Sequence, residues 1–380
     1  MPIAPIPVTI ITGFLGAGKT TLLNRLLKDP ALADTIVIIN EFGEIGLDHL
    51  FIETQDDNMI LMASGCLCCT IRGDLISTLE DLIKKFDTGA LTGFKRIMIE
   101  TTGLADPAPI LQSLLGHPMI VARYTLDGVV TLVDAVNGSL TLDHHPEAVK
   151  QAAIADRIVL TKTDLQADET ALRARLNALN PAADVLDAAR GEAMANALIG
   201  TGLFDLTKKI PDVAQWLKAE AYGDHGHHHH HDHGHDHDHH HHDHHHHDNQ
   251  NPHDVNRHDA HIRAFCLTTH DAIPSSAFEL FLTLLKSAHG EKLLRMKGIV
   301  KIAEHPDRPV ILHGVQHVFH PPVRLARWPD DERQTKMVFI TKDLDESFVS
   351  RLWEAFLDRP GIDTPDRSAM LDNPLSLRRE

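Results

Sequence analysis

The chain has 380 residues, enough for two domains of ordinary size, and 43% of them are hydrophobic, so a sizeable core can form. Its formal net charge of −17, with histidine neutral, argues against nucleic acid or an anionic membrane as the main partner, because both need a basic surface. The 30 histidines are the unusual feature of the composition.

The N-terminal sequence and the cysteines indicate a cytoplasmic protein. Met1–Gly13 has no basic segment followed by a long apolar one, so we predict no signal peptide, and no apolar run is long enough to span a membrane. Three of the four cysteines, Cys66, Cys68 and Cys69, lie within four positions. Neighbouring cysteines rarely form a sound disulfide, so we expect a reducing compartment with metal or redox chemistry.

The first part of the chain alternates apolar runs of strand length with amphipathic helical patterns. The predicted strands are Val8–Ile11, Ile36–Ile39, Met59–Met62, Ile97–Ile99, Val129–Val133 and Ile158–Leu160. The predicted helices are Thr20–Lys28, Asp74–Phe86, Pro107–Leu115 and Glu169–Leu179. This alternation predicts an α/β domain at residues 1–215, with a mainly parallel sheet covered on both faces.

A histidine-rich linker is predicted at residues 216–258. From His225 to His247 every residue is His, Asp or Gly, and 17 of these 23 residues are His. No packed core can form from this composition, so we expect a disordered, solvated loop. An expression tag is the alternative, but the tract is internal and interleaved with aspartate.

A smaller α+β domain is predicted at residues 259–365, followed by a tail at 366–380. Ser276-x-x-Glu279 has the form of a capping box that opens a helix ending at Gly290, and a last helix carries Phe348 and Trp353. The predicted strands of this domain are Ile262–Leu267, Leu293–Ile302, Val310–Phe319, Val323–Trp328 and Lys336–Ile340.

A phosphate-binding loop is predicted where the sequence matches G-x-x-x-x-G-K-[S/T] between a strand and a helix. Together with the guanine-recognition segment described next, it predicts that the first domain is a P-loop NTPase G domain. Its backbone N–H groups converge on the β-phosphate, and the helix N-terminus adds positive potential. Lys19 is predicted to reach the β- and γ-phosphates, and Thr20 to ligate Mg²⁺. The residues assigned to the nucleotide here are Gly13, Gly16, Ala17, Gly18, Lys19, Thr20 and Thr21.

The segment from Thr161 to Asp164 ends a late strand and is predicted to recognise guanine. The Asp164 carboxylate can accept hydrogen bonds from N1–H and from the 2-amino group, neither of which adenine offers. The stem of Lys162 can lie along the base, and Thr161 stands where GTPases carry asparagine, so we expect one weakened hydrogen bond to guanine. A polar surface loop, or an ATP-using P-loop kinase or transferase, is the alternative.

Two acidic strand ends are candidates for sensing the γ-phosphate. Glu100 follows a strand expected beside the P-loop and is predicted to act on Mg²⁺ or its waters, while the Gly103 N–H is predicted to contact the γ-phosphate and report its loss. Lys19, Glu100 and Gly103 are therefore the predicted catalytic residues. Glu41 lies where a switch loop is expected and is a candidate metal ligand; solvated strand ends are the alternative for both glutamates.

The cysteine cluster is predicted to hold a transferable metal ion. Cys66, Cys68 and Cys69 supply at most three sulfur ligands, whereas a structural zinc site closes with four. The site needs other ligands or stays open, which suits an ion that is picked up and released. A following helix N-terminus lowers thiol pKa values and favours metallation. A redox pair or buried small residues are the alternatives.

These motifs together resemble the CobW-type metal-chaperone GTPases, relatives of the nickel-insertion GTPases. In chain order they are GFLGAGKTT, NEFGEIGLD, GCLCC, ETTGLADP, TKTD, the histidine tract and the second domain. The resemblance implies a GTPase that binds GTP and Mg²⁺ with Zn²⁺ or Co²⁺ and delivers metal to a client metalloprotein on hydrolysis. It also implies Glu44 and His117 as metal ligands.

The histidine tract is predicted to bind several ions weakly, exchange them fast and so feed the cysteine site. Our main hypothesis is a GTP-hydrolysing zinc chaperone, because thiolates favour zinc. The alternatives are a metal-storage protein that uses the tract, and a cobalt chaperone for cobalamin biosynthesis. The oligomeric state is left open, with a homodimer among the options.

Overall fold

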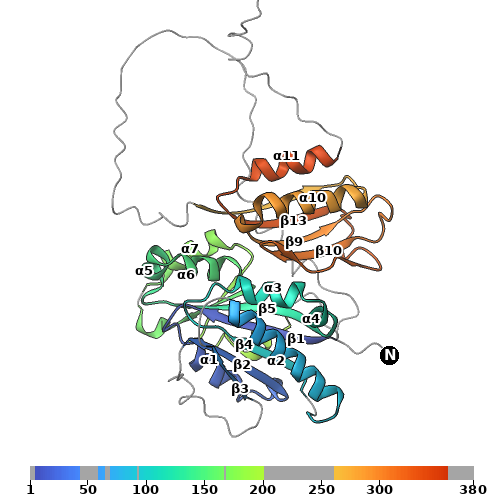
Figure 1. Ribbon diagram of the computed structural model, residues 1–380. Coiled ribbons are helices and arrows are strands. Elements are labelled where there is room, and N and C mark those ends of the chain that lie inside the picture. The colour runs from blue at the N-terminus through green and yellow to red at the C-terminus, as the bar shows by residue number, and fades with distance from the viewer. Residues whose placement is uncertain are drawn as a thin grey trace, which may run out of the picture.

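The computed structural model describes residues 5–42, 59–64, 69–91, 94–166, 168–200 and 261–357, arranged as two stacked units that each contain a sheet and helices (Figure 1). The domain boundaries expected near residues 215, 258 and 365 lie outside these ranges and stay predictions. The histidine tract also lies outside them. Within the described ranges, no helix has the length and apolar character needed to cross a membrane.

The first unit is built on a seven-stranded parallel sheet, which confirms the predicted fold class. Its strand order is β3-β2-β4-β1-β5-β6-β7. The strands are β1 (Ile6–Gly13), β2 (Thr35–Phe42), β3 (Met59–Ser64), β4 (Arg96–Glu100), β5 (Tyr124–Asp134), β6 (Arg157–Thr161) and β7 (Asp184–Asp187). Only β7 was not predicted, because it is a four-residue edge strand with no long apolar run.

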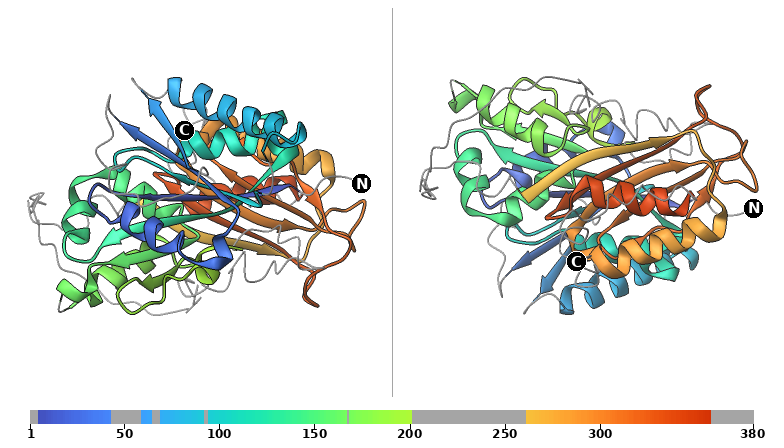
Figure 2. Two further views of the ribbon diagram at one scale, coloured as in Figure 1. Left: turned by 90° about the horizontal axis from the view of Figure 1, so that it is seen from below. Right: turned by 90° about the horizontal axis from the view of Figure 1, so that it is seen from above.

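Helices cover both faces of this sheet, as the continuous apolar strands predicted (Figure 2). Val8 and Ile10 of β1 pack into the core under the helices α2 (Cys69–Asp87) and α3 (Ala108–Gly116), whereas Ile11 packs on the opposite face under α1 (Lys19–Leu26). The remaining helices of this unit are α4 (Pro118–Arg123), α5 (Gly138–His144), α6 (Pro146–Ala153), α7 (Thr170–Leu179) and α8 (Ala195–Leu198). Helices α4, α5, α6 and α8 were not predicted; each has eight residues or fewer, and none follows a motif such as the phosphate-binding loop, which marks the start of the equally short α1.

The second unit is an antiparallel sheet with two helices on one face, which confirms the predicted α+β domain. Met337 and Phe339 of one strand face the two helices, while Val338 and Ile340 face the first unit. Its elements are β8 (Ile262–Thr269), α10 (Ser275–His289), β9 (Leu293–Val300), β10 (Val310–Val315), β11 (Val318–Phe319), β12 (Val323–Arg324), β13 (Thr335–Lys342) and α11 (Glu346–Phe356).

Three local predictions for this unit were wrong. Val310–Phe319 is not one strand, because Gln316 adopts a φ of 54° and turns the chain into the hairpin β10–β11. Val323–Trp328 contributes only the two-residue strand β12. The capping box is absent, since α10 begins at Ser275 without a side-chain cap of its own, and the Ser275 N–H donates instead to Glu304.

The two units are joined by a buried cluster of charges centred on Asp156. This residue follows α6, and its carboxylate accepts hydrogen bonds from Arg295 Nη2 at 2.9 Å and from Lys297 Nζ at 2.6 Å, both on β9. The same carboxylate accepts the Val129 N–H at 2.9 Å. Burial by itself raises the pKa of Asp156, but the two cations outweigh burial and hold this pKa well below its ordinary value.

Apolar packing surrounds this cluster. Leu294 and Ile340 of the second unit lie in the same core as Leu111 and Ile154 of the first. A Cβ at Gly116, where α3 ends, would lie 2.7 Å from Val318 Cγ1, so a larger residue here would require the Val318 side chain to move. The two units therefore share one continuous core and are not separate bodies joined only by the linker.

We predict that Asp156→Ala lowers the free energy of unfolding by about 3–5 kcal/mol, because Arg295 and Lys297 would stay buried without their anion. Urea unfolding at neutral pH measures this loss. Asp307→Ala is the matched control, since it removes an exposed ion pair with Arg333 and should change stability little. Equal losses in the two variants would contradict a role for the buried cluster.

Candidate nucleotide-binding site

The loop between β1 and α1 has the curvature that phosphate binding requires. Gly13, Gly16 and Gly18 have φ values of 138°, 73° and 88°, which side-chain-bearing residues rarely adopt. At Gly13, a Cβ would also lie 2.4 Å from Leu132 O. Glycine is therefore required at these positions by the positive φ values of the loop and, at Gly13, also by its close contact with β5.

Lys19 opens α1, and its ammonium lies within the curve of this loop. The side chain is buried, and Nζ donates to Gly13 O at 2.9 Å and to Phe14 O at 3.3 Å. The helix N-terminus behind the loop adds partial positive charge at the same place. This arrangement fits the predicted contact of Lys19 with phosphate oxygens.

Thr20 and Glu100 come together although 80 residues separate them. Their strands are neighbours, since Ile11 of β1 pairs with Glu100 at the carboxyl end of β4, and Thr20 Oγ1 donates to Glu100 Oε1 at 3.2 Å. A hydroxyl and a carboxylate are oxygen ligands of the kind that Mg²⁺ prefers. Both predicted Mg²⁺ residues thus lie beside the P-loop. Thr21, the next residue of α1, is exposed.

The loop from Thr101 to Pro107, which we call the sensor loop, packs against the P-loop. Thr101 N donates to Ile11 O at 2.9 Å, and a Cβ at Gly103 would lie only 2.6 Å from Leu15 N. The Gly103 backbone therefore lies in contact with the phosphate-binding loop, as its predicted role needs.

Gln151 of α6 also holds this loop, and the sequence analysis missed it. Its Nε2 donates to Gly103 O at 3.2 Å and to Ala105 O at 3.0 Å, and the side chain is 1% exposed. The sequence feature that could have identified Gln151 is its place among the apolar residues Val149 and Ala152, which are buried on the same helix.

Thr161 fastens the base-recognition segment to the P-loop. Its Oγ1 donates to Ala17 O at 2.9 Å, so in this structure the hydroxyl bonds the P-loop backbone, which the sequence analysis did not anticipate. A threonine can supply this bond as an asparagine could, because only one donor is needed. Threonine in place of asparagine at position 161 therefore affects the hydrogen bond between the base-recognition segment and the P-loop.

Lys162 and Asp164 follow this anchor. Lys162 has a φ of 57°, and its Nζ lies 2.7 Å from Asp134 Oδ2. Asp164 is exposed in a short 3-10 turn, which Thr163 ties to Asp187 at the end of β7 through a 2.7 Å hydrogen bond. Asp164 is thus exposed beyond the carboxyl end of β6, at the same edge of the sheet as the P-loop. Asp187 was not among the predicted residues.

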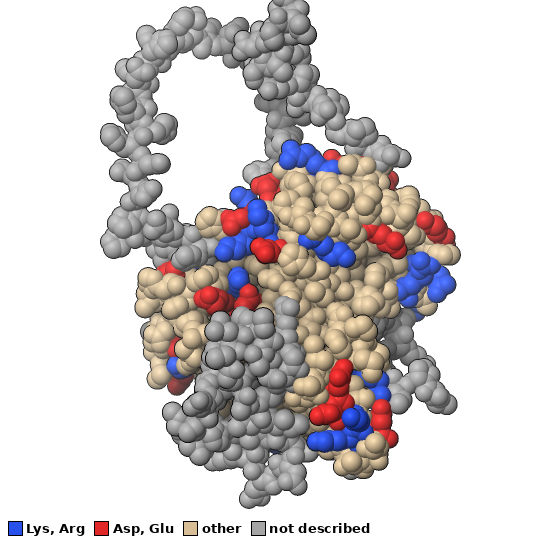
Figure 3. Space-filling model, viewed as in Figure 1, with Lys and Arg blue, Asp and Glu red and all other residues tan. Residues whose placement is uncertain are grey.

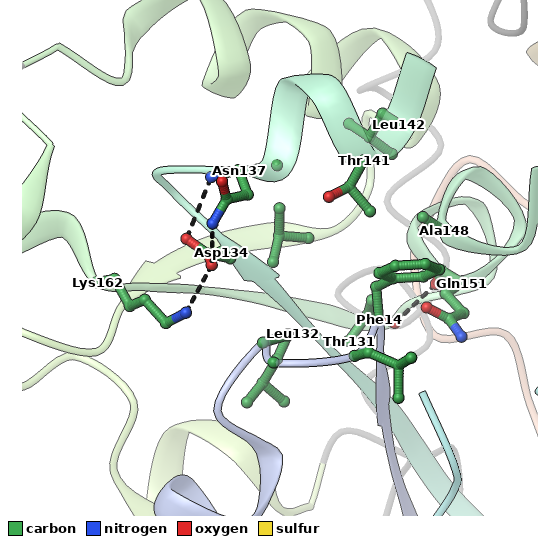
Figure 4. Close-up of a pocket in the computed structure, with 15 residues that line it drawn as sticks. Phe14, Thr131, Leu132, Asp134, Asn137, Thr141, Leu142, Ala148, Gln151 and Lys162 are labelled. Atoms are coloured by element: carbon green, nitrogen blue, oxygen red, sulfur yellow. Dashed lines mark hydrogen bonds and ion pairs between the residues drawn. The ribbon is translucent and has the colours of Figure 1, made fainter. Parts of the chain in front are cut away.

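A cavity of about 220 Å³ lies between the P-loop and helices α5 and α6 (Figure 4). Asp134 and Lys162 stand at one end, and Phe14 and Gln151 at the other. Burial raises the pKa of Asp134, but hydrogen bonds from Lys162 and Asn137 bring this pKa below its ordinary value. The aspartate is therefore an anion that holds the lysine ammonium in place.

Most of the predicted metal ligands fall where side chains are not described. Cys66, Cys68 and Glu44 lie outside the described residues, and for Glu41 and Cys69 only the backbone is described. Glu41 pairs in register with Ala63, so the chain enters the cysteine segment from the strand next to Glu41. Among the described residues, no group of three or more His, Cys, Asp or Glu is arranged to hold a metal.

His117 lies between α3 and α4, with Nδ1 4.0 Å from Glu80 Oε1 of α2. Glu80 and Cys69 are 11 residues apart on α2. A rise of 1.5 Å per residue separates their backbones by roughly 16 Å, about three turns. His117 is therefore a candidate ligand for a site separate in space from the cysteine segment.

Comparisons with known proteins agree with this geometry. Residues 7–187 match the family described as CobW/HypB/UreG, nucleotide-binding domain, and residues 262–357 match the Cobalamin synthesis protein cobW C-terminal domain. The chain is 32% identical over 345 residues to the zinc chaperone YjiA of Escherichia coli, covering 91% of this chain and 96% of that protein.

Two further similarities extend this result. Over 229 residues the chain is 30% identical to zinc-regulated GTPase metalloprotein activator 1 of Schizosaccharomyces pombe, covering 58% of this chain and 50% of that protein. The crystal structure of Zn(II)-bound YjiA GTPase from E. coli superposes with a TM-score of 0.63 at 27% identity, covering 93% of this chain and 99% of that one.

We predict that Thr161→Val weakens GDP and GTP binding equally, by about five- to tenfold, because the P-loop loses one buried hydrogen bond at Ala17 O. Titration with fluorescent guanine nucleotides measures both affinities. Thr161→Ser keeps the hydroxyl and should bind like the wild type. Unchanged affinity in the valine variant would show that this bond does not support the site.

We also predict that Asp164→Asn shifts the nucleotide preference from GTP toward xanthosine triphosphate by on the order of 100-fold. The amide cannot accept both guanine hydrogen bonds, whereas it can donate to the xanthine oxygen. Competition between the two nucleotides measures this ratio. An Asn variant that still prefers GTP would remove Asp164 from the base site.

Proposed function

This chain belongs to the CobW/HypB/UreG family and is a P-loop GTPase, and we propose that it is a metallochaperone. In this proposal Cys66, Cys68 and Cys69 bind Zn²⁺, and hydrolysis of GTP to GDP and phosphate releases the ion to a client metalloprotein. The cytoplasm, where thiols stay reduced, is the compartment we propose.

The observation that carries the proposal is the strand order β3-β2-β4-β1. Taken in this order across the sheet, the parallel strands end at the cysteine segment, near Glu41, at Glu100 and at the P-loop. Neighbouring strands lie about 4.8 Å apart, so roughly 14 Å separate the end of β3 from the P-loop. A change at the γ-phosphate can therefore reach the metal ligands across two intervening strand ends.

The nucleotide chemistry uses residues at the same edge. Lys19 would hold the β- and γ-phosphates, Thr20 and Glu100 would hold Mg²⁺, and the Gly103 N–H would contact the γ-phosphate. When bound, Mg²⁺ offsets the charge that develops on the phosphate oxygens. Thr161, Lys162 and Asp164 orient the guanine. The contact of Thr20 with Glu100 supports this assignment, since both oxygens converge beside the P-loop.

For the metal site, Glu41 lies one residue before the end of β2, beside the strand β3 that leads into the cysteine segment, and we propose it as an oxygen ligand. Glu44 stays a proposal from sequence. His117 with Glu80 is proposed as a secondary site, because about three turns of α2 separate it from Cys69.

Zinc is the ion we favour, since thiolates bind it well and two of the relatives are named for zinc. The match of residues 262–357 to a domain named for cobalamin synthesis keeps cobalt as a second candidate. On the face shown in Figure 3, Lys and Arg stand in small groups beside Asp and Glu, without one continuous basic patch. The net charge of −17 argues against a nucleic acid as the partner, and we propose a protein client.

We predict that a non-hydrolysable GTP analogue tightens zinc binding relative to GDP, by about five- to 150-fold, and that zinc tightens binding of the analogue by the same factor. Competition with a chromogenic chelator measures zinc affinity in each nucleotide state. Cys66→Ser should abolish the nucleotide-dependent binding, whereas Cys266→Ser, on β8 of the second unit, should retain it. Equal zinc affinities in the two nucleotide states would refute the coupling.

We predict that deletion of residues 225–247 removes most of the weakly bound metal but leaves one tightly bound ion per chain. The tract supplies exchanging imidazole ligands, whereas the tight site uses thiolates. Metal analysis after dialysis against a weak chelator measures the stoichiometry. Loss of all bound metal would favour the storage hypothesis over a chaperone.

A further inference from the structure

Helix α6 makes two contacts with the sensor loop, the segment from Thr101 to Pro107. Gln151 Nε2 donates to Gly103 O at 3.2 Å and to Ala105 O at 3.0 Å. Lys150 Nζ lies 2.8 Å from Asp106 Oδ2 in a partly buried ion pair. Consecutive side chains of one helix therefore hold the middle and the end of this loop.

The chemistry of the Gln151 contact allows few substitutes. Both partners are backbone carbonyls, which only accept hydrogen bonds, so residue 151 must present a group with two N–H donors. Gln151 is buried, and water cannot easily replace it there. A carboxylate at this position would face two carbonyl oxygens, and an apolar side chain would leave both without this donor.

The same helix is fixed at both of its ends. At the N-terminal end, the His145 ring stacks on Phe14 of the P-loop, with ring centroids 4.3 Å apart. Beyond the C-terminal end, Asp156 is held by Arg295 and Lys297 of the second unit. Because α6 touches the P-loop and is anchored in the domain interface, it can set the distance between the sensor loop and the P-loop.

We propose that Gln151 is a positioning residue for GTP hydrolysis. By holding the Gly103 carbonyl, it keeps the N–H of Gly103 directed at the γ-phosphate. The inference rests on the proposed contact of Gly103 with this phosphate. It does not depend on metal delivery, because neither zinc nor a client takes part. GDP, which has no γ-phosphate, gains nothing from the positioned loop, so nucleotide binding and the rate of hydrolysis should respond differently.

The test compares Gln151→Leu, Gln151→Glu and Gln151→Asn with the wild-type full chain in steady-state GTP hydrolysis with Mg²⁺ and without zinc. We expect kcat to fall about tenfold to 100-fold in the Leu and Glu variants, since small misplacements in an active site have effects of this size. The KM for GTP and the Kd for fluorescent GDP should stay within about twofold. The Asn variant keeps the donors on a shorter stem and should be intermediate.

Thr131→Val is the matched control. Thr131 Oγ1 donates to the backbone carbonyl of Gln151 at 2.7 Å, so this variant loses one buried hydrogen bond in the same place but keeps both bonds of Nε2. It should lose stability without a comparable loss of kcat. Thermal unfolding of every variant identifies those that fold. If the Leu and Glu variants do not fold, the test uses the Asn variant.

Two outcomes would overturn the proposal. One is a folded Leu or Glu variant with wild-type kcat. The other is an equal loss of kcat and of GDP affinity, which would indicate that Gln151 supports the whole site and not the γ-phosphate contact. A failure of zinc delivery by the wild-type protein would leave these hydrolysis measurements unaffected, so the two proposals fail separately.

Discussion

Parallel pairing of the strands is the constraint on which the site depends. Seven strands run in one direction, so all their carboxyl ends meet at one edge, and residues as distant in sequence as Thr20 and Glu100 come within hydrogen-bond distance there. Only backbone hydrogen bonds and two buried faces are needed to fix this arrangement. The chemistry is carried by the loops that leave this edge, and short hydrogen bonds between loops, such as Thr161 to Ala17 O, set their mutual positions.

Sequence reasoning recovered the parts whose signal is local. The P-loop could be predicted because glycine spacing reflects the required φ values, and six of the seven strands because they are continuous apolar runs. The contacts of Gln151 and Asp156 could not be predicted, since each depends on which loop or strand packs above α6. The local sequence around Gln151 does not indicate a partner 48 residues away, and the sequence around Asp156 does not indicate one 139 residues away.

The charges buried between the two units are costly to desolvate, and an apolar interface of similar volume could be as stable. Arg295 and Lys297 converge on one carboxylate, which also binds the Val129 N–H, so the cluster fits only one relative placement of β9 and α6. Apolar contacts such as those of Leu294 and Ile340 tolerate sliding, but this set of hydrogen bonds does not. We regard the cluster as a device for alignment more than for stability.

The shared core has a consequence for the covalent connection between the two units. Leu294 and Ile340 complete a core that begins at β1, and Gly116 lies close to Val318, so contacts among the described residues already hold the two units together. The connecting segment, which we propose gathers metal, is therefore not the sole link between the two units.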